Sequence, residues 1–154
     1  MIDQNEQFLM AWLRISSTVS NERIVSELSF NEALVCDVLY YGNMLKMTQK
    51  WTATDLCKLT HMHKTLMNRT IKSLEKKKII LRKPDDEDKR RYFVEINPEN
   101  FDVFLTVHEN SMKLVRQVTE SIGQEKTEAA IEIFHNISET VDQVLYQKGD
   151  KEND

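Results

Sequence analysis

Apolar residues recur at helical spacing through most of this chain, and the spacing changes to that of strands in one stretch, residues 79–96. Residues that interrupt helices are scarce, because the 154 residues include only three glycines and two prolines. A chain of this length is ordinary for one domain with a buried core. The sequence therefore predicts a mainly α fold with a small β-hairpin.

Capping signals mark the ends of several helices. Ser29 with Glu32 and Thr52 with Asp55 each form the pattern of a capping box, and Gly42 is expected to end the helix that Ser29 opens. The predicted helices cover residues 4–28, 30–42, 53–59, 63–77, 98–121 and 126–147.

Other signals shape the two ends of the chain. The first helix is expected to break near Ser20 and Asn21. Pro98 suits the first position of the long helix after the strands, and Gly123 interrupts that helix. The tail 148–154 is polar, so we expect it to fray.

The middle of the chain has a distinct order of elements. A short helix, a turn at 60–63 and a second helix precede two strands, 79–83 and 91–96, around a polar turn at 84–89. On the second helix the side chains predicted to face inward are Leu66, Met67, Thr70, Ile71 and Leu74. Those predicted to face outward are Lys64, Thr65, Asn68, Arg69, Lys72 and Ser73. This order predicts a winged helix-turn-helix core, with the hairpin as the wing.

Positive charge is concentrated in this middle segment. From Lys58 to Tyr92 there are twelve lysines and arginines against five acids, a net charge of +7, whereas the rest of the chain carries −11. Screening limits the reach of each charge to about 8 Å at physiological salt, so a local basic patch attracts phosphate although the whole chain is acidic. The alternative interpretation is a solvated charged surface.

The outer face of the second helix has side chains suited to DNA. Asn68 can bond adenine, Arg69 can bond guanine, and Thr65 suits a thymine methyl group or a phosphate, in a major groove that admits one helix. Arg90 and its basic neighbours near the wing tip can reach the minor groove or the backbone. The DNA-contacting residues that we predict are Thr52, Lys64, Thr65, Asn68, Arg69, Lys72, Arg82, Asp88, Lys89, Arg90 and Arg91.

Residues 74–90, LEKKKIILRKPDDEDKR, resemble the central segment of the MarR (multiple antibiotic resistance regulator) family. The layout of helices around this segment is also similar. The resemblance implies a winged-helix homodimer that represses or activates nearby genes, and we expect a repressor. It further implies that Asp88 orients the wing and that Arg90 reaches the minor groove.

The chain departs from the family's pattern at two places. Lys78 stands where the family usually has glycine. If the backbone there must be left-handed, a lysine costs on the order of 1 kcal/mol of stability relative to glycine. Ile96 and Asn97 stand where the strand after the wing often ends Leu-Thr. Both changes concern local turn geometry and neither removes a DNA-contacting group.

The terminal helices carry more apolar surface than a small winged core can cover. Their stripes lie within residues 8–28, 101–122 and 130–145. We predict that they pair across a two-fold axis, since two DNA-binding cores about one DNA turn apart recognise a longer sequence than one core does. The whole chain, 1–154, is then a single domain. Its DNA-binding lobe is about 30–97, and its dimerisation lobe is residues 1–28 plus 98–147.

Several residues allow both a functional and a structural interpretation. Cys36 and Cys57 are either redox sensors or buried inert thiols, and the interpretation as buried inert thiols is favoured for both. The histidines could bind a metal ion. For His61 and His63, which precede the second helix of the predicted helix-turn-helix, contact with phosphate is favoured over metal binding. The histidines considered were His61, His63, His108 and His135. We expect no metal site.

Other groups of side chains also have two interpretations. Trp12, Trp51, Tyr40, Tyr41 and Phe104 line a ligand pocket or fill the core, and the core is favoured. The acidic turn 85–88 lacks the spacing of a calcium loop, so a solvated turn is favoured. Lysines 76–78 either contact the DNA backbone or remain hydrated.

Taken together, these patterns favour a sequence-specific DNA-binding transcription regulator that binds a pseudo-palindromic operator. Similar family members bind small molecules between the two lobes, so a small-molecule effector is a further expected partner. The alternative is a protein-interaction or dimer scaffold module without DNA binding. No catalytic pattern is visible, so we expect no enzyme and no cofactor. Two cysteines and the absence of a signal peptide or membrane span favour the cytoplasm.

Overall fold

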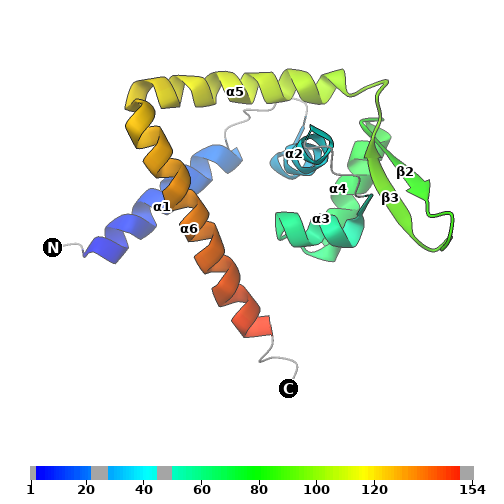
Figure 1. Cartoon of the computed structure of the whole chain (residues 1–154), viewed down its shortest axis with the longest axis horizontal. Helices are drawn as coiled ribbons and strands as arrows, with labels where there is room; N and C mark the ends of the chain where they lie inside the picture. Colours follow the sequence, from blue (N-terminus) through cyan, green and yellow to red (C-terminus); the bar gives the residue numbers. More distant parts are fainter. Residues whose placement is uncertain (1–2, 22–27, 45–49, 150–154) are drawn as a thin grey trace. The chain divides into compact units, whose positions relative to one another are not determined.

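The computed structural model describes residues 3–21, 28–44 and 50–149. Within these ranges the chain forms six helices and one antiparallel sheet (Figure 1), which confirms the predicted fold class. In chain order the elements are α1 (Gln4–Asn21), α2 (Phe30–Met44), β1 (Trp51–Thr52), α3 (Ala53–Thr60), α4 (Lys64–Lys76), β2 (Ile80–Pro84), β3 (Tyr92–Ile96), α5 (Asp102–Ile122) and α6 (Gln124–Gly149). The predicted helix part 22–27 and residues 150–154 of the predicted tail lie outside the described residues, whereas residues 148–149 of that tail belong to α6.

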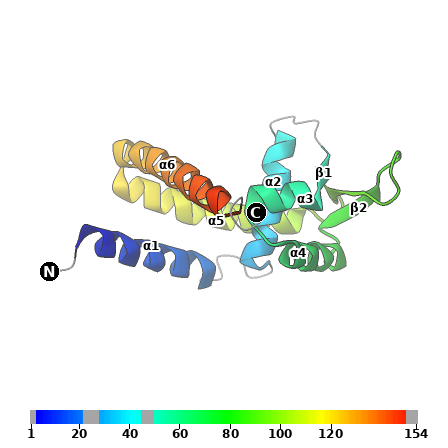
Figure 2. The ribbon, with the colours of Figure 1, turned by 90° about the horizontal axis from the view of Figure 1, so that it is seen from below.

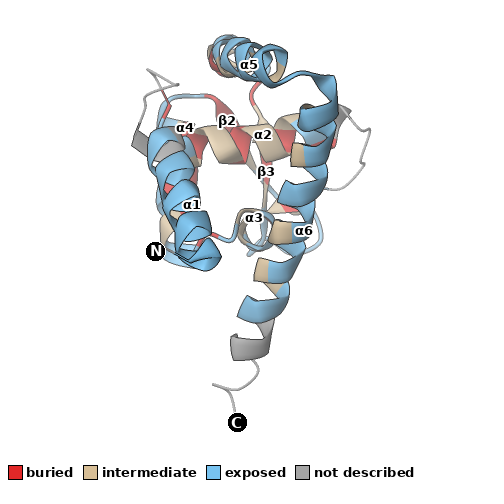
Figure 3. Ribbon diagram, turned by 90° about the vertical axis from the view of Figure 1, so that its left-hand side faces the viewer, coloured by how far each residue is buried: buried red, intermediate tan, exposed pale blue. Residues whose placement is uncertain are grey.

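The chain divides within α5 into two compact units, one ending at Ser111 and the other beginning at Met112. The apolar core of the first unit is formed by α2, α3, α4, the sheet and the first turns of α5. Its largest fully buried side chains are Leu39, Leu56, Met67, Ile71, Leu74, Ile79, Ile80 and Phe104. Figure 3 shows that burial is concentrated on this winged helix-turn-helix, whereas α1 and α6 are exposed along most of their described length.

The two predicted capping boxes are confirmed. The backbone N–H of Ser29 donates to Glu32 Oε2 (2.7 Å), and the N–H of Glu32 donates to Ser29 Oγ (3.3 Å). The corresponding bonds between Thr52 and Asp55 are 3.0 and 3.2 Å long. Each box satisfies donors that the first turn of a helix leaves without partners, so α2 and α3 begin where the local sequence places them.

The sheet has the order β1-β3-β2 and contains one strand that the sequence did not predict. This strand, β1, is only two residues long and pairs Trp51 with Val94 and Thr52 with Phe93. Two residues show no periodicity, so its pairing depends on the tertiary fold. The predicted hairpin is present, and it extends away from α3 and α4 (Figure 2).

Gly42 does not end α2, contrary to the prediction, because the helix continues to Met44. A Cβ at this position would lie 3.0 Å from Nε1 of Trp51. Trp51 is buried against the helix backbone at this point, with 8% of its surface exposed. The glycine therefore permits close approach of an indole ring rather than a change of chain direction.

Pro98 is not the first residue of the long helix, because α5 begins at Asp102. The side chain of the buried Asn97 holds the preceding chain in a turn. Its Oδ1 accepts the backbone N–H of Glu99 (3.2 Å), and its Nδ2 donates to the carbonyl of Lys78 (2.7 Å). Such a side-chain bond two residues ahead competes with helix formation, which delays the start of α5.

Lys78 has the left-handed backbone that its departure from the family's glycine suggested, with a φ of 57°. Its N–H donates to the carbonyl of Glu75 (2.9 Å), and the N–H of Ile79 donates to that of Leu74 (3.0 Å). These are the two bonds of a Schellman motif, which ends a helix at a left-handed residue.

Lys78→Gly is expected to raise the free energy of unfolding by about 1 kcal/mol, because glycine adopts this backbone without a Cβ clash. Urea unfolding measures the change. Lys76→Gly, two residues earlier within α4, is the matched control and is expected to lower stability by about 1 kcal/mol. Equal destabilisation by both substitutions would contradict this account of the helix end.

The second unit contains the end of α5 and all of α6. Gly123 separates the two helices with a φ of 83°, which confirms that it interrupts the long helix. Large apolar side chains are exposed in the single chain on these helices and on α1 of the first unit. They are Phe8, Leu9, Met10, Trp12, Leu13, Ile15, Leu114, Val115, Val118, Ile122, Ile131, Ile133, Phe134, Val144 and Leu145. None of the described helices has the length and apolar character needed to cross a membrane.

Candidate nucleic-acid interface

The recognition helix α4 has one buried and one polar face. Met67, Thr70, Ile71 and Leu74 are buried, as the helical spacing predicted, and Leu66 is partly buried. Lys64, Thr65, Asn68, Arg69 and Lys72 are exposed on the other side. Ser73 differs from the prediction, because it is partly buried and donates a 2.6 Å hydrogen bond to Glu32 Oε1 of α2.

A tight turn joins α3 to α4. His61 closes α3 in a left-handed conformation, with a φ of 56°, and Met62 is buried beneath the turn. His61 and His63 are exposed, whereas His108 Nδ1 lies 3.2 Å from Asp37 Oδ1. No cluster of three or more histidine, cysteine or acidic side chains suited to a metal ion occurs in the described ranges.

The acids of the wing turn form hydrogen bonds with its backbone. Asp88 Oδ1 accepts the N–H of Arg90 (3.0 Å), and the carbonyl of Asp88 accepts the N–H of Arg91 (2.8 Å). Asp85 Oδ1 accepts the N–H of Glu87 (3.0 Å). Asp88, Lys89, Arg90 and Arg91 are all exposed. The turn therefore presents three consecutive basic side chains from a backbone that its own carboxylates stabilise.

A cavity of about 440 Å³ lies where the start of α3, the exposed face of α4 and the base of the wing meet. Its lining residues are Thr52, Ala53, Thr54, Asp55, Asn68, Ile71, Arg82, Arg90, Arg91, Tyr92 and Val94. Five predicted site residues are thereby brought together: Thr52, Asn68, Arg82, Arg90 and Arg91. The other six, Lys64, Thr65, Arg69, Lys72, Asp88 and Lys89, lie outside the cavity lining.

The cavity lining also includes residues that the sequence did not assign to the site, among them Ala53, Thr54 and Tyr92. The first two belong to the opening turn of α3, where backbone N–H groups have no partner within the helix. The capping box at Thr52 was a signal for this position. Tyr92, half exposed at the start of β3, had no comparable signal.

Thr52 and Arg82 have partners within the chain. The hydroxyl of Thr52 donates to Asp55 Oδ2 (2.6 Å), so it holds the start of α3. Arg82 Nη2 lies 2.9 Å from Glu75 Oε2, which joins β2 to the last turns of α4. Both residues therefore line the cavity while fixing the elements that form it.

The charge in the cavity is positive. Hydrogen bonds from Thr52 hold the pKa of the Asp55 carboxyl below its usual value, and the charges of Lys58 and Arg91 act in the same direction. Asp55 is therefore ionised at neutral pH and contributes one negative charge. The guanidinium groups of Arg82, Arg90 and Arg91 outnumber it, which leaves an excess of positive charge toward anions.

The remaining candidate residues have structural environments. Burial raises the pKa of the Cys36 thiol to about 12, so the thiolate is scarce at neutral pH. Burial also raises the pKa of Cys57. Tyr40, Phe101, Phe104 and His108 form one aromatic cluster between α2 and the start of α5, with ring centroids 4.9–6.0 Å apart. Tyr41 joins this cluster, with its ring centroid 5.5 Å from that of Tyr40 and 5.9 Å from that of His108. Trp51 instead packs on Gly42, and Trp12 packs edge-on against Phe8.

Residues 43–91, which include most of the winged core, match the family model of the MarR family. The matched residues include α3, α4, β2 and the turn of the wing. This match confirms the resemblance that residues 74–90 indicated. No curated protein sequence matches the chain significantly.

Solved structures share the fold over nearly the whole chain. The transcriptional regulator BldR from Sulfolobus solfataricus is 20% identical, with a TM-score of 0.70, and the match covers 88% of this chain and 95% of BldR. Bordetella bronchiseptica BpsR, whose DNA binding is regulated by 6-hydroxynicotinic acid, is 12% identical (TM-score 0.69; 88% and 99% covered). Staphylococcus aureus MepR in complex with DNA is 13% identical (TM-score 0.67; 93% and 97% covered). Identities this low support a common fold and no more.

Proposed function

We propose that this protein is a sequence-specific transcription regulator that binds a pseudo-palindromic operator as a homodimer and acts as a repressor. The observation that supports this most directly is the cavity that Asn68 of α4 lines together with Arg90 and Arg91 of the wing. A groove-reading helix and a basic hairpin on one surface can contact bases and backbone of the same duplex. The DNA complex of the structurally similar MepR is consistent with this use of the fold.

The exposed residues of α4 divide between base and backbone contacts in this proposal. Asn68 bonds adenine, Arg69 bonds guanine and Thr65 contacts a thymine methyl group or a phosphate. Lys64 and Lys72 contact phosphates. The arginines around the cavity, with backbone N–H groups at the start of α3, hold the DNA backbone beside the recognition helix.

A homodimer accounts for the exposed apolar side chains of α1, α5 and α6. Isolated apolar residues on a surface are ordinary, but rows of them along three helices are typical of surfaces that another chain covers. We place the dimerisation lobe in residues 1–28 and 98–147 and the DNA-binding lobe in residues 30–97. Release by a small-molecule effector follows the precedent of BpsR, and two cysteines without a disulfide suit the cytoplasm.

Selection of bound duplexes from a random library, using the purified chain, tests the proposal. We expect enrichment of an inverted repeat whose half-sites lie about one helical turn apart. Light scattering on the same sample should give twice the chain mass of 18.1 kDa. A pool that stays random after repeated rounds would instead favour the scaffold alternative, in which the winged helix does not bind DNA.

A further inference from the structure

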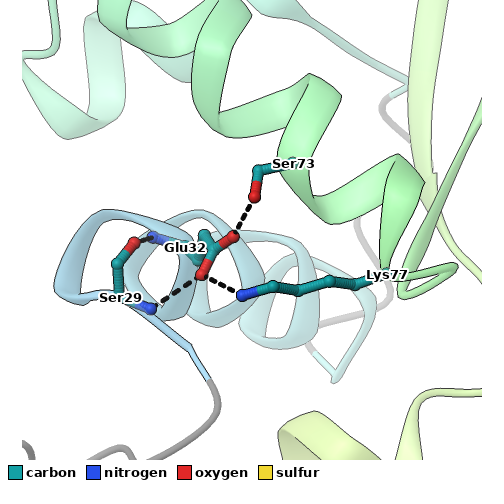
Figure 4. Close-up of polar contacts among 4 residues, drawn as sticks. All are labelled: Ser29, Glu32, Ser73 and Lys77. Atoms are coloured by element: carbon teal, nitrogen blue, oxygen red, sulfur yellow. Dashed lines mark hydrogen bonds and ion pairs between the residues drawn. The ribbon is translucent and has the colours of Figure 1, made fainter.

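A buried carboxylate on α2 contacts the end of the recognition helix. Glu32 is only 4% exposed, and its Oε1 accepts a 2.6 Å hydrogen bond from Ser73 Oγ. Its Oε2 accepts bonds of 2.7 Å from Lys77 Nζ and from the backbone N–H of Ser29 (Figure 4). We call these four residues the Glu32 cluster. Ser73 lies in the last turns of α4 and Lys77 is the residue that caps its end, 41 and 45 residues along the chain from Glu32.

Stability alone does not explain a charged group in this position. Burial raises the pKa of Glu32, but the hydrogen bonds from Lys77, Ser73 and Ser29 outweigh it, so the pKa lies below its usual value. The carboxylate is therefore charged at neutral pH, and removing it from water is costly. Apolar residues of similar volume often stabilise a protein as well as a buried ion pair does. What the ion pair of Glu32 and Lys77 adds is a directional contact that orients α4.

The geometry of the Glu32 cluster restrains the rotation of α4. Ser73 and Lys77 are one turn apart, so they lie on the same side of the helix. The apolar contacts of Met67, Ile71 and Leu74 hold α4 against the core, but hydrophobic contact is not directional. Hydrogen bonds are directional, and two of them to one carboxylate fix which side of α4 faces α2.

A small rotation of α4 matters for reading bases. With side chains, a helix is about 10–12 Å in diameter, so a turn of about 20° about its axis moves a side-chain tip by about 2 Å. The donor–acceptor distances of hydrogen bonds span only about 0.5 Å. Such a rotation would therefore break the bonds of Asn68 and Arg69 to base edges, whereas flexible lysines could still contact phosphates.

We infer that Glu32 is a positioning residue for sequence discrimination, which it controls by setting the rotation of α4 through Ser73 and Lys77. The inference rests on the proposed function and adds to it a residue that contacts no DNA. The inference predicts different effects on two affinities, for a selected and for a random duplex, that general destabilisation would lower together. Affinity for the selected duplex depends on the rotation of α4, whereas affinity for a random duplex depends mainly on charge.

Glu32→Ala tests the inference. At a temperature at which circular dichroism shows the variant folded, the ratio of selected-duplex to random-duplex affinity is expected to fall about tenfold, the loss of one base contact. Affinity for the random duplex should stay equal or rise, because the chain loses one negative charge. The matched control Glu99→Ala removes the same charge from an exposed turn and should leave the ratio within about twofold.

Glu32→Gln is expected to restore most of the discrimination. Its amide oxygen can accept from Ser29 and Lys77, and its NH₂ can donate to Ser73 Oγ, so the bonding pattern survives without the charge. If Glu32→Ala does not fold, Ser73→Ala removes one of the two contacts and should give a smaller loss of the same kind. An unchanged ratio in the folded variant, or an equal fall in both affinities, would overturn the inference.

Hydrogen exchange distinguishes failure of this inference from failure of the proposed function. If the wild-type protein does not discriminate between duplexes, the proposed function fails. The positioning role is then tested by the amide exchange of α4. In Glu32→Ala the last two turns of α4 should exchange faster while α3 keeps its protection. Unchanged exchange in α4 would overturn the role of Glu32 in holding this helix.

Discussion

Replacing Arg90 with alanine is expected to weaken binding to every DNA sequence by tenfold or more, because a charged hydrogen bond to DNA contributes about 1.5–3 kcal/mol in each protomer. The side chain is exposed near the tip of the wing, and its backbone N–H is held by Asp88 Oδ1. The substitution should therefore remove a DNA contact without disturbing the turn. Fluorescence anisotropy with selected and random duplexes measures both affinities.

The pattern across variants identifies the kind of contact. For Arg90→Ala the slope of log affinity against log salt should become shallower by about two in a dimer, since each lost phosphate contact contributes about 0.9. Asn68→Ala should leave this slope unchanged and relax discrimination at one position. Lys126→Ala, at an exposed cation of α6 outside the candidate interface, is the control. Equal losses for Arg90→Ala and Lys126→Ala would count against a DNA-contacting wing.

Phe104→Ala is expected to lower the free energy of unfolding by about 3–5 kcal/mol, because it removes a fully buried ring and leaves a cavity. Phe104 is 1% exposed and packs with Tyr40 of α2 and with Phe101, at ring-centroid distances of 5.6 and 4.9 Å. This cluster attaches the start of α5 to the winged core. The loss should lower the midpoint of thermal unfolding by roughly 10 °C for a chain of this size.

Phe30→Ala is the matched control, since Phe30 lies at the start of α2 with 47% of its surface exposed. It is expected to change the free energy of unfolding by less than about 1 kcal/mol. Urea unfolding of both variants at one protein concentration provides the comparison. Similar small losses for both substitutions would show that the aromatic cluster does not hold α5 to the core.

The sequence predicted those parts of the structure that depend on residues a few positions apart. Ser29 with Glu32, and Thr52 with Asp55, form capping boxes because both partners lie within one helical turn. The left-handed backbone at Lys78 was instead suggested by the resemblance to the family, whose glycine this lysine replaces. These patterns are readable because helix ends leave the same backbone donors and acceptors unpaired in any protein.

Features that depend on distant residues were not predictable in this way. β1 exists because Trp51 pairs with Val94, and Gly42 permits the approach of the Trp51 indole. Neither partner is visible in the other's local sequence. Ser73 similarly belonged to the predicted polar face of α4, yet it faces the carboxylate of Glu32. The residues of the wing and α4 were predicted, whereas the cavity between them required the fold.

The central property proposed for this protein is that α4 and the basic wing bind DNA through both its bases and its phosphates. The most direct test is the affinity of the wild-type protein for a selected and a random duplex across a salt series. We predict at least about a thousandfold preference for the selected duplex at physiological salt. We also predict that log affinity falls linearly with log salt, at about 0.9 per phosphate contact. Equal affinities for the two duplexes, or an affinity independent of salt, would contradict the account.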